Sequence, residues 1–270
     1  MKIVIDAGHG LTTAGKRCPD DSMREFHFNS AVARYIREEL AGYTTVTGGD
    51  LTVKFVHDEA GNVDVSLSQR VATANGWNAD VYVSIHANAF GSGWNDANGI
   101  ETFAATVASQ TSVKLAQAVQ RQLIIKTGRK DRSVKRADFT VIAKTTMPAI
   151  LVEAGFMTHR EEAALLKTDA YRRKVASAIV EGLAEVYGLK RNVVTEPTKP
   201  TEPSTPVNTK TATLSPVNVI VNGTKLNDGH ITNSTTYVPA REIAAAIGGM
   251  CGVDVKVTWD AATRTVSITK

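Results

Sequence analysis

Apolar residues in the first 190 positions form two kinds of pattern, and the two alternate along the chain. Short runs rich in β-branched residues, typical of buried strands, cover residues 2–5, 52–56, 81–85, 100–104 and 149–152. Segments with apolar residues at three- and four-residue spacing, typical of helices, cover residues 25–40, 67–74, 109–126 and 160–187. This alternation predicts an α/β fold in which helices flank both faces of a mostly parallel, twisted sheet.

A segment rich in proline and threonine interrupts this pattern. Five of the eight prolines fall between Pro197 and Pro216, and apolar residues are sparse there. Such a segment buries too little surface to fold, and its prolines favour extended geometry. We therefore predict a linker over residues 191–212, between a domain of residues 1–190 and a small module of residues 213–270.

The small module has a different pattern of predicted elements, made of short strands and one short helix. Asn222-Gly223 separates two short β-rich runs and predicts a hairpin with a tight turn. A short helix is predicted over residues 239–247, and a second hairpin over residues 253–269. We expect a compact α+β module, and its sequence shows no cluster of catalytic residues.

Composition limits the classes of protein to which the chain can belong. Hydrophobic residues make up 43% and charged residues 21%, as in globular proteins. No apolar stretch approaches the roughly 20 residues of a membrane-spanning helix, so we expect no stable membrane insertion. The net charge of +4 is too small to indicate a nucleic-acid-binding protein. Two cysteines cannot make a disulfide scaffold or a zinc finger. We expect a monomer.

Three residues with metal-binding or catalytic side chains come directly after predicted strands. His9 follows the first strand, His86 follows a central one, and Glu153 ends the last. In open α/β sheets, ligands bind beyond the carboxyl ends of the strands, so we expect these side chains to form a polar cluster in a cleft. A buried glutamate is costly unless it is paired or binds a metal. Either histidine alone is equally consistent with a structural role.

Zinc is the metal that this residue set indicates. Catalytic zinc sites use about three protein ligands, typically His and Glu, and keep a position for water. Glu25, at the start of the helix predicted over residues 25–40, supplies the missing ligand. The alternative role of Glu25 is that of an acid which stabilises the helix N-terminus.

Four separated motifs, in this order, resemble the zinc-dependent N-acetylmuramoyl-L-alanine amidases of bacterial cell walls and their phages. The motifs are IDAGHG, Glu25-x-x-x-Asn29, SIHANA and MPAILVEAGFMTH. The resemblance covers residues 2–188, and it is specific because four motifs match together where any one would be weak. The family usually has glycines shortly after the first histidine, whereas this chain has Leu-Thr-Thr-Ala-Gly at residues 11–15. This difference concerns that loop only.

The resemblance implies roles for four residues. Zinc (Zn²⁺) would be held by His9, Glu25 and His86, and Glu153 would be the catalytic carboxylate. The resemblance also implies the substrate, which is the amide that joins the lactyl group of N-acetylmuramic acid to L-alanine in peptidoglycan. Glu153 would then take a proton from the attacking water and return it to the departing alanine nitrogen.

Three further residues are candidates for a place in or beside the site. Asp6 could hold the second nitrogen of a zinc-binding imidazole, and Asn88 and Arg70 could contact the substrate or serve the structure. The other histidines are expected to be surface or structural residues, with the first of them nearest the site: His27, His57, His159 and His230.

A basic run lies between residues 126 and 136, with six Lys or Arg residues and one acid. We expect residues 139–142 to form a strand that leads towards Glu153, which would place the basic run beside the cleft. The run is then either a solvated surface or a patch that attracts the carboxylates of peptidoglycan stem peptides.

The small module has a resemblance of its own. VNVIVNG, TTYVPAREIAAAIGG and VTWDAATRTVSI resemble the copper amine oxidase N-terminal-like module that is often attached to bacterial extracellular and wall proteins. The name implies no copper here, because the module has a single histidine, His230. Its expected role is attachment to the cell wall, which raises the local concentration of the enzyme at its substrate.

Taken together, these features predict a peptidoglycan hydrolase whose partner is the bacterial cell wall, and they most resemble a phage endolysin. No secretory signal fits before Asp6, so we expect the protein in the host cytoplasm until the membrane is breached. The alternatives are a secreted bacterial autolysin, a zinc peptidase that cuts the stem peptide, and an inactive wall-binding protein.

Overall fold

The computed structural model describes residues 1–192 and, beyond them, only the backbone of short strands between residues 215 and 269. The chain divides into two units, Met1–Pro197 and Thr198–Lys270, and each is described by itself. Within the part of the chain that the structure describes, no helix combines the length and the apolar character needed to cross a membrane.

The first unit is built on a six-stranded sheet with the order β3-β1-β4-β7-β5-β6. Neighbouring strands are parallel except for β5 and β7, so the predicted mostly parallel sheet is confirmed. The strands are β1 (Lys2–Ala7), β3 (Thr52–Phe55), β4 (Val81–Asn88), β5 (Ile100–Ala104), β6 (Asp131–Arg136) and β7 (Ala149–Phe156). A separate pair joins β2 (Tyr43–Thr44) to β8 (Lys190–Arg191), and β8 crosses the predicted domain boundary at residue 190.

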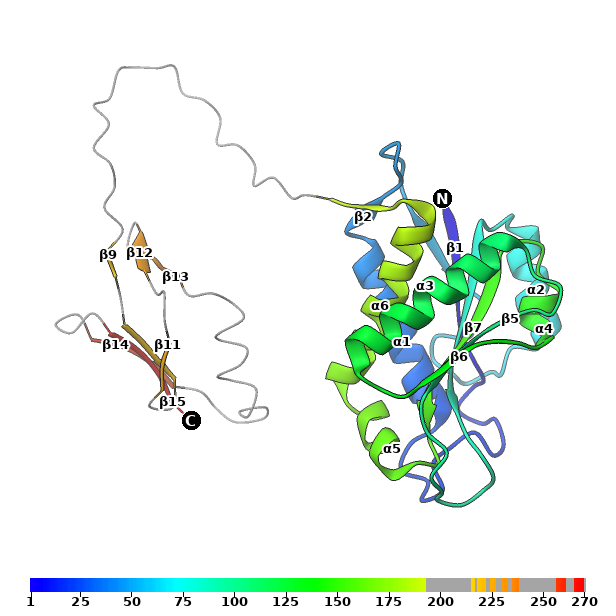
Figure 1. Cartoon of the computed structure of the whole chain (residues 1–270), viewed down its shortest axis with the longest axis horizontal. Coiled ribbons are helices and arrows are strands. Elements are labelled where there is room, and N and C mark those ends of the chain that lie inside the picture. The colour runs from blue at the N-terminus through cyan, green and yellow to red at the C-terminus, as the bar shows by residue number, and fades with distance from the viewer. Residues whose placement is uncertain are drawn as a thin grey trace. The chain divides into compact units, whose positions relative to one another are not determined.

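Helices cover both faces of this sheet, as expected (Figure 1). The larger core cluster holds side chains from α1 (Glu25–Leu40), α3 (Gln110–Thr127) and α6 (Asp169–Tyr187) on one face. The smaller cluster holds side chains from α2 (Leu67–Gly76) and α4 (Thr140–Ala143) on the other. We call the second face the α2/α4 face. The remaining helix, α5 (Arg160–Leu166), follows β7.

Strand alternation decides which polar side chains reach the α2/α4 face. Val4, Tyr82 and Leu151 pack in its apolar cluster. Because every second residue of a strand points to the same face, the polar residues beyond them point there too. These residues are Asp6, Ser84, His86 and Glu153. The carboxyl-terminal parts of β1, β4 and β7 therefore carry a row of polar groups on this face.

One expectation about the second half of this unit was wrong. Residues 139–142 are not a strand, because Thr140–Ala143 forms the single-turn helix α4. A run of four residues satisfies either pattern, and here one helical turn buries Val141 and Ile142 against the sheet. The strand in this region is β6, inside the basic run. The helical pattern predicted over residues 160–187 is confirmed and forms two helices, because Thr168 caps the start of α6 through its side chain.

The second unit contains the two predicted hairpins. β10 (Asn218–Val221) pairs antiparallel with β11 (Thr224–Leu226), and β14 (Lys256–Asp260) pairs antiparallel with β15 (Thr265–Thr269). A further sheet joins β9 (Ser215–Pro216), β12 (His230–Thr232) and β13 (Thr235–Tyr237). The predicted helix at 239–247 and nearly all of the predicted linker lie outside the described residues.

Candidate metal centre and active site

The structure brings His9, Glu25 and His86 together. The Glu25 carboxylate lies between the two rings, with Oε2 at 3.3 Å from His9 Nε2 and Oε1 at 2.9 Å from His86 Nδ1. One ligand atom from each residue lies within 4.8 Å of the others. Two imidazole nitrogens and one carboxylate oxygen at this spacing can hold a divalent metal such as zinc.

The loop after β1 delivers His9 in a conformation that few residues adopt. Its backbone has a φ of 65°, in the left-handed region. Gly8 before it must lack a side chain, because a Cβ there would lie 2.0 Å from Cε1 of His86. Asn29, one helical turn after Glu25, donates to the Gly8 carbonyl at 3.0 Å and to Glu25 Oε1 at 3.3 Å. The first turn of α1 therefore binds the histidine loop directly.

Glu153 lies directly beside this cluster. It stands opposite His86 in the register of β4 and β7. Its Oε2 is buried and has no hydrogen-bond partner among the described residues. Burial, with a contribution from the nearby charge of Glu25, raises the pKa of Glu153 to about 8. A buried carboxyl with an unused oxygen and a pKa near neutrality has the properties of a general acid–base.

The imidazoles differ in their electrostatics. Burial lowers the pKa of His9 to about 4, so its ring is neutral and can donate a lone pair to a metal. Burial acts in the same direction on His86, but the hydrogen bond and charge of Glu25 outweigh it and raise the pKa of His86. Burial opposes the ionisation of Glu25, and the combined effect of His86 and His9 still lowers its pKa.

A chain of hydrogen bonds runs from His86 to Asp6, the first of the three further candidates. Ser84 Oγ lies 3.2 Å from His86 Nε2 and donates to Asp6 Oδ2 at 2.9 Å. Tyr82 also donates to Asp6 Oδ2, at 2.8 Å. Because the Ser84 hydrogen is directed to Asp6, the Ser84 oxygen accepts from Nε2–H of His86. Nδ1 of His86 lies 2.9 Å from Glu25 Oε1, so a ring protonated on both nitrogens also donates to Glu25, and a bound metal would take the place of the Nδ1 proton.

Arg70, the second further candidate, is buried under the histidine loop. Its guanidinium forms an ion pair with Asp6 and donates to the carbonyls of Ala7 and His9, at 2.6 and 3.1 Å. It also contacts Asp64 at 3.2 Å. The side chain is only 1% exposed, so it holds the backbone on both sides of Gly8 in place.

Asn88, the third, donates to Glu101 Oε1 at 2.8 Å and so supports a second buried carboxylate. The other described histidines have structural partners, as expected. His57 accepts from the backbone N–H of Ala7, and His27 and His159 accept at the starts of α1 and α5. The side chain of His230 lies outside the described residues.

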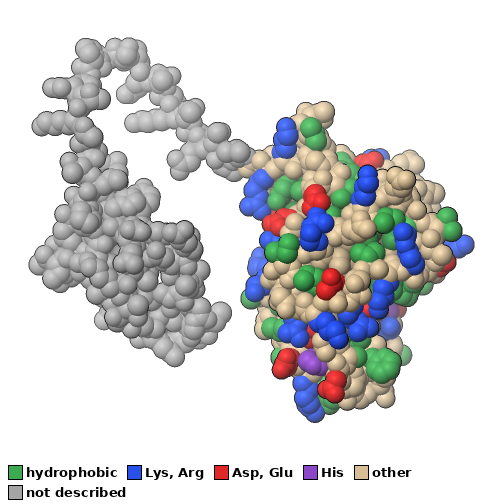
Figure 2. Space-filling view, viewed as in Figure 1, with side chains coloured by type: hydrophobic (Ala, Val, Ile, Leu, Met, Phe, Trp, Pro, Cys, Tyr) green, Lys and Arg blue, Asp and Glu red, His purple; other side chains and the backbone are tan. Residues whose placement is uncertain are grey.

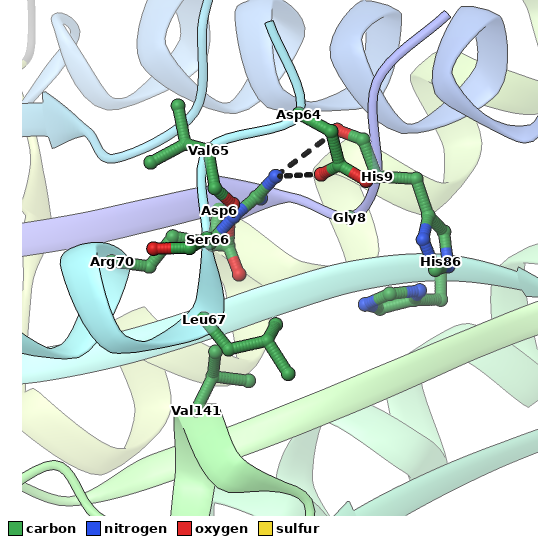
Figure 3. Close-up of a pocket in the computed structure, with 10 residues that line it drawn as sticks. All are labelled: Asp6, Gly8, His9, Asp64, Val65, Ser66, Leu67, Arg70, His86 and Val141. Atoms are coloured by element: carbon green, nitrogen blue, oxygen red, sulfur yellow. Dashed lines mark hydrogen bonds and ion pairs between the residues drawn. The ribbon is translucent and has the colours of Figure 1, made fainter. Parts of the chain in front are cut away.

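A cavity of about 260 Å³ opens beside the histidines (Figure 3). Leu67 of α2 and Val141 of α4 lie together on one side of it, and the rings of His9 and His86 lie on another. Asp64 closes a third side and is hydrogen-bonded to Arg70. This cavity reaches the two histidines of the cluster from the α2/α4 face.

Most of the basic run has carboxylate partners. Lys126 pairs with Glu181, Arg129 pairs with the buried Glu162, and both Arg132 and Lys135 pair with Glu101. Figure 2 shows basic and acidic side chains interspersed over one face of this unit. The run is therefore not a uniform basic patch, and only its pair on Glu101 lies near Glu153.

A family model described as N-acetylmuramoyl-L-alanine amidase matches residues 3–185. The chain belongs to this family. The endolysin of Bacillus phage SPP1 is 33% identical over 189 residues, which cover 69% of this chain and 66% of that protein. N-acetylmuramoyl-L-alanine amidase LytC of Bacillus subtilis is 34% identical over 186 residues, 68% of this chain and 35% of that protein.

A solved structure agrees with this assignment. The catalytic domain of CwlV, an N-acetylmuramoyl-L-alanine amidase from Bacillus (Paenibacillus) polymyxa var. colistinus, matches with a TM-score of 0.62 at 32% identity. The match covers 70% of this chain and 99% of that domain. A second family model, described as the copper amine oxidase N-terminal domain, matches residues 220–270. The predicted families, enzyme class and fold class are confirmed.

Sequence reasoning missed three residues that the site uses, Ser84, Asn29 and Glu101. Ser84 and Asn29 lie inside the motifs that carry the family resemblance. Their spacing from His86 and Glu25 indicates that they share a face with these residues. Ser84 lies two residues before His86 on the same face of a strand, and Asn29 lies one helical turn after Glu25. Glu101 had no such signal, because only the antiparallel pairing of β5 with β7 places it beside Glu153.

Proposed function

We propose that the first unit is a zinc-dependent amidase that cuts the bond between the lactyl group of N-acetylmuramic acid and L-alanine of the stem peptide. The observation that carries this proposal is the unpartnered, buried Oε2 of Glu153 beside a cluster of His9, Glu25 and His86. A buried carboxyl group of this kind is costly unless it serves a reaction or a ligand.

The donor set fits zinc. Two imidazole nitrogens and one carboxylate oxygen come from three separate segments, which is the ligand type of catalytic rather than structural zinc sites. His86 would bind through Nδ1, because Ser84 occupies its other nitrogen, and His9 would bind through Nε2, the atom nearest Glu25. Bound zinc would polarise the scissile carbonyl and lower the pKa of a water molecule to about 7.

The chain's own residues supply the proton transfers. Glu153 Oε2 is free to accept a proton from the attacking water. The same carboxyl then delivers that proton to the alanine nitrogen, which leaves as an amine. Burial raises the pKa of Glu153, which makes its carboxylate a stronger proton acceptor than an exposed glutamate. Arg70 and Asn29 keep the histidine loop and Glu25 in place during these steps.

Two variants and one product analysis test this function. Glu153→Gln keeps the shape of the side chain and removes the proton acceptor, so we expect full zinc content and a loss of hydrolysis of about 10²–10⁴-fold. His86→Ala should lose zinc by elemental analysis.

Mass spectrometry of digested walls should show intact glycan strands and stem peptides with a new N-terminal alanine. A stem peptide cut elsewhere identifies a peptidase instead, and undiminished zinc in His86→Ala contradicts the ligand set.

We further propose that the enzyme acts as a phage endolysin, held in the cytoplasm until the membrane is breached. The 33% identity to the SPP1 endolysin supports this setting. The 34% identity to LytC supports the alternative, a bacterial autolysin that works in the wall. The neighbourhood of the gene decides between them, because an endolysin gene lies among phage genes that include a membrane-permeabilising protein.

We also propose that the second unit attaches the enzyme to the cell wall. The support is the match of residues 220–270 to the copper amine oxidase N-terminal domain, joined to a catalytic unit whose proposed substrate is insoluble. Binding of this kind raises the local concentration of the enzyme at its substrate without changing the chemistry.

A further inference from the structure

Beyond Glu153, the α2/α4 face carries a second group of charges. Glu101 stands opposite Glu153 in the register of β5 and β7, so the two side chains point to the same face. Glu101 is 5% exposed, and its Oε2 binds Arg132 Nε at 2.6 Å and Lys135 Nζ. Asn88 donates to its other oxygen. We call Glu101, Arg132 and Lys135 the cationic trio.

The cationic trio holds more positive charge than its carboxylate needs. One cation would neutralise Glu101, and the structure supplies two, so the trio has a net charge of +1. The side chain of Lys135 is 39% exposed, and its ammonium has three donors, of which the carboxylate uses one. The trio can therefore bind a further anion from solvent.

The trio lies on the side of the sheet where the substrate must bind. Lys135 is aligned with Phe103, and Phe103 packs in the apolar cluster of the α2/α4 face. The Lys135 ammonium reaches back from β6 to Glu101 on β5, the strand next to Glu153. Neighbouring strands are about 4.8 Å apart, so the ammonium lies roughly one to two strand spacings from the catalytic carboxyl.

The other side of the cluster offers no comparable exposed cation among the groups that pair there. Arg70 is shared between Asp6 and Asp64, and its side chain is only 1% exposed. An anionic group on the substrate therefore finds an exposed ammonium donor on the β5 side of Glu153, at Lys135.

We propose that Lys135, supported by Arg132, binds a carboxylate of the stem peptide on the residue that follows alanine. This inference rests on the proposed amidase function. When the scissile amide lies at Glu153, the alanine extends away from it. The residue after alanine then begins about 3.3–3.6 Å further along an extended chain. Its carboxylate falls within reach of the Lys135 ammonium. The uncharged glycan then extends towards Leu67 and Val141.

The test uses two soluble muramoyl peptides that differ at one group, a carboxylate or a carboxamide on the residue after alanine. The full-length enzyme should cleave the carboxylate form with a kcat/KM about 5- to 10-fold higher, as expected for one partly exposed, charge-assisted hydrogen bond. Lys135→Met should remove this preference by lowering kcat/KM for the carboxylate form alone. Lys135→Arg should retain it.

Lys130→Met is the matched control, because it removes the same charge from an exposed lysine of the same basic run. It should leave the preference unchanged. If Lys135→Met lowers kcat/KM equally for both peptides, Lys135 acts only through Glu101 and the subsite is wrong. If Lys130→Met removes the preference as well, the effect is general attraction and the subsite is again wrong. A wild-type enzyme that releases alanine-terminated peptide from neither substrate contradicts the amidase function itself.

Discussion

Ser84 is the residue through which a buried carboxylate reaches a proposed metal ligand. It donates to Asp6 and lies 3.2 Å from Nε2 of His86, so with zinc on Nδ1 it would accept the Nε2 proton and hold the ring. Ser84→Ala removes this acceptor and leaves the fold in place, since the side chain is small. Partners of this kind typically contribute 10- to 100-fold to metal affinity, so we expect the zinc Kd to rise by about that factor. A competition titration against a chelator measures it.

The control for this variant is Ser68→Ala, because Ser68 is an exposed serine on α2 that is not among the residues lining the cavity. Its zinc affinity should equal that of the wild type. Nitrogen-15 spectra of the imidazole in the zinc-loaded protein give a second measurement. The Nε2–H signal of His86 should show a hydrogen bond in the wild type and lose it in Ser84→Ala. Equal zinc affinity in both serine variants would show that Ser84 has no part in holding His86.

At this scale the sequence predicted which groups would cluster and missed the residues that hold them. His9 follows β1, and His86 and Glu153 lie in the carboxyl halves of β4 and β7, so a rule about strand ends brought them together without knowledge of the rest of the fold. Ser84 acts only because Asp6 lies opposite it in the register of β1 and β4. A register between strands that are far apart in sequence is a tertiary property, so the pattern along the chain does not contain it.

At the scale of elements, the close approach of α3 and α6 depends on Gly182. A Cβ at this position would lie 2.5 Å from Cγ2 and 2.9 Å from the backbone N and Cα of Val119. Backbone atoms cannot move aside, so Gly182→Ala forces the two helices apart. We expect a loss of about 1–3 kcal/mol in the free energy of unfolding, measured by urea denaturation.

Gly76, near the end of α2, is the matched control. A Cβ there meets nothing within 4 Å, and its backbone is not in the left-handed region. Gly76→Ala should be neutral or stabilise the protein by about 0.4–1 kcal/mol, because alanine restricts the unfolded chain. If the two variants have the same stability, the contact between α3 and α6 is looser than the structure indicates.

The elements also show where pattern reasoning works. The bounds of α1 were predicted as residues 25–40, because its apolar stripe is long enough to fix both the period and the ends. α4 was mistaken for a strand because four residues cannot establish a period. β6 was missed because its residues are mostly polar and charged, and only its pairing with β5 defines it.

At the scale of the whole molecule, the structure suggests where the catalytic unit can be shortened. β8 pairs with β2, and the N–H of Asn192 donates to the carbonyl of Gly42 at 2.7 Å. Arg191 also contacts Glu39 at 3.1 Å. A chain cut at residue 190 would lose these contacts, so the shorter form that we expect to fold ends after residue 192.

The last prediction separates catalysis from attachment to the wall. Residues 1–192 should fold, bind one zinc ion and cleave soluble muropeptides at the rate of the full chain, because all the proposed site residues lie between residues 6 and 153. On intact walls their activity should fall about tenfold or more, since the tether is gone. Residues 213–270 alone should sediment with purified walls without hydrolysis. Equal clearance of intact walls by both forms would show that the second unit has another role, and aggregation of residues 1–192 would show that it supports the catalytic unit structurally.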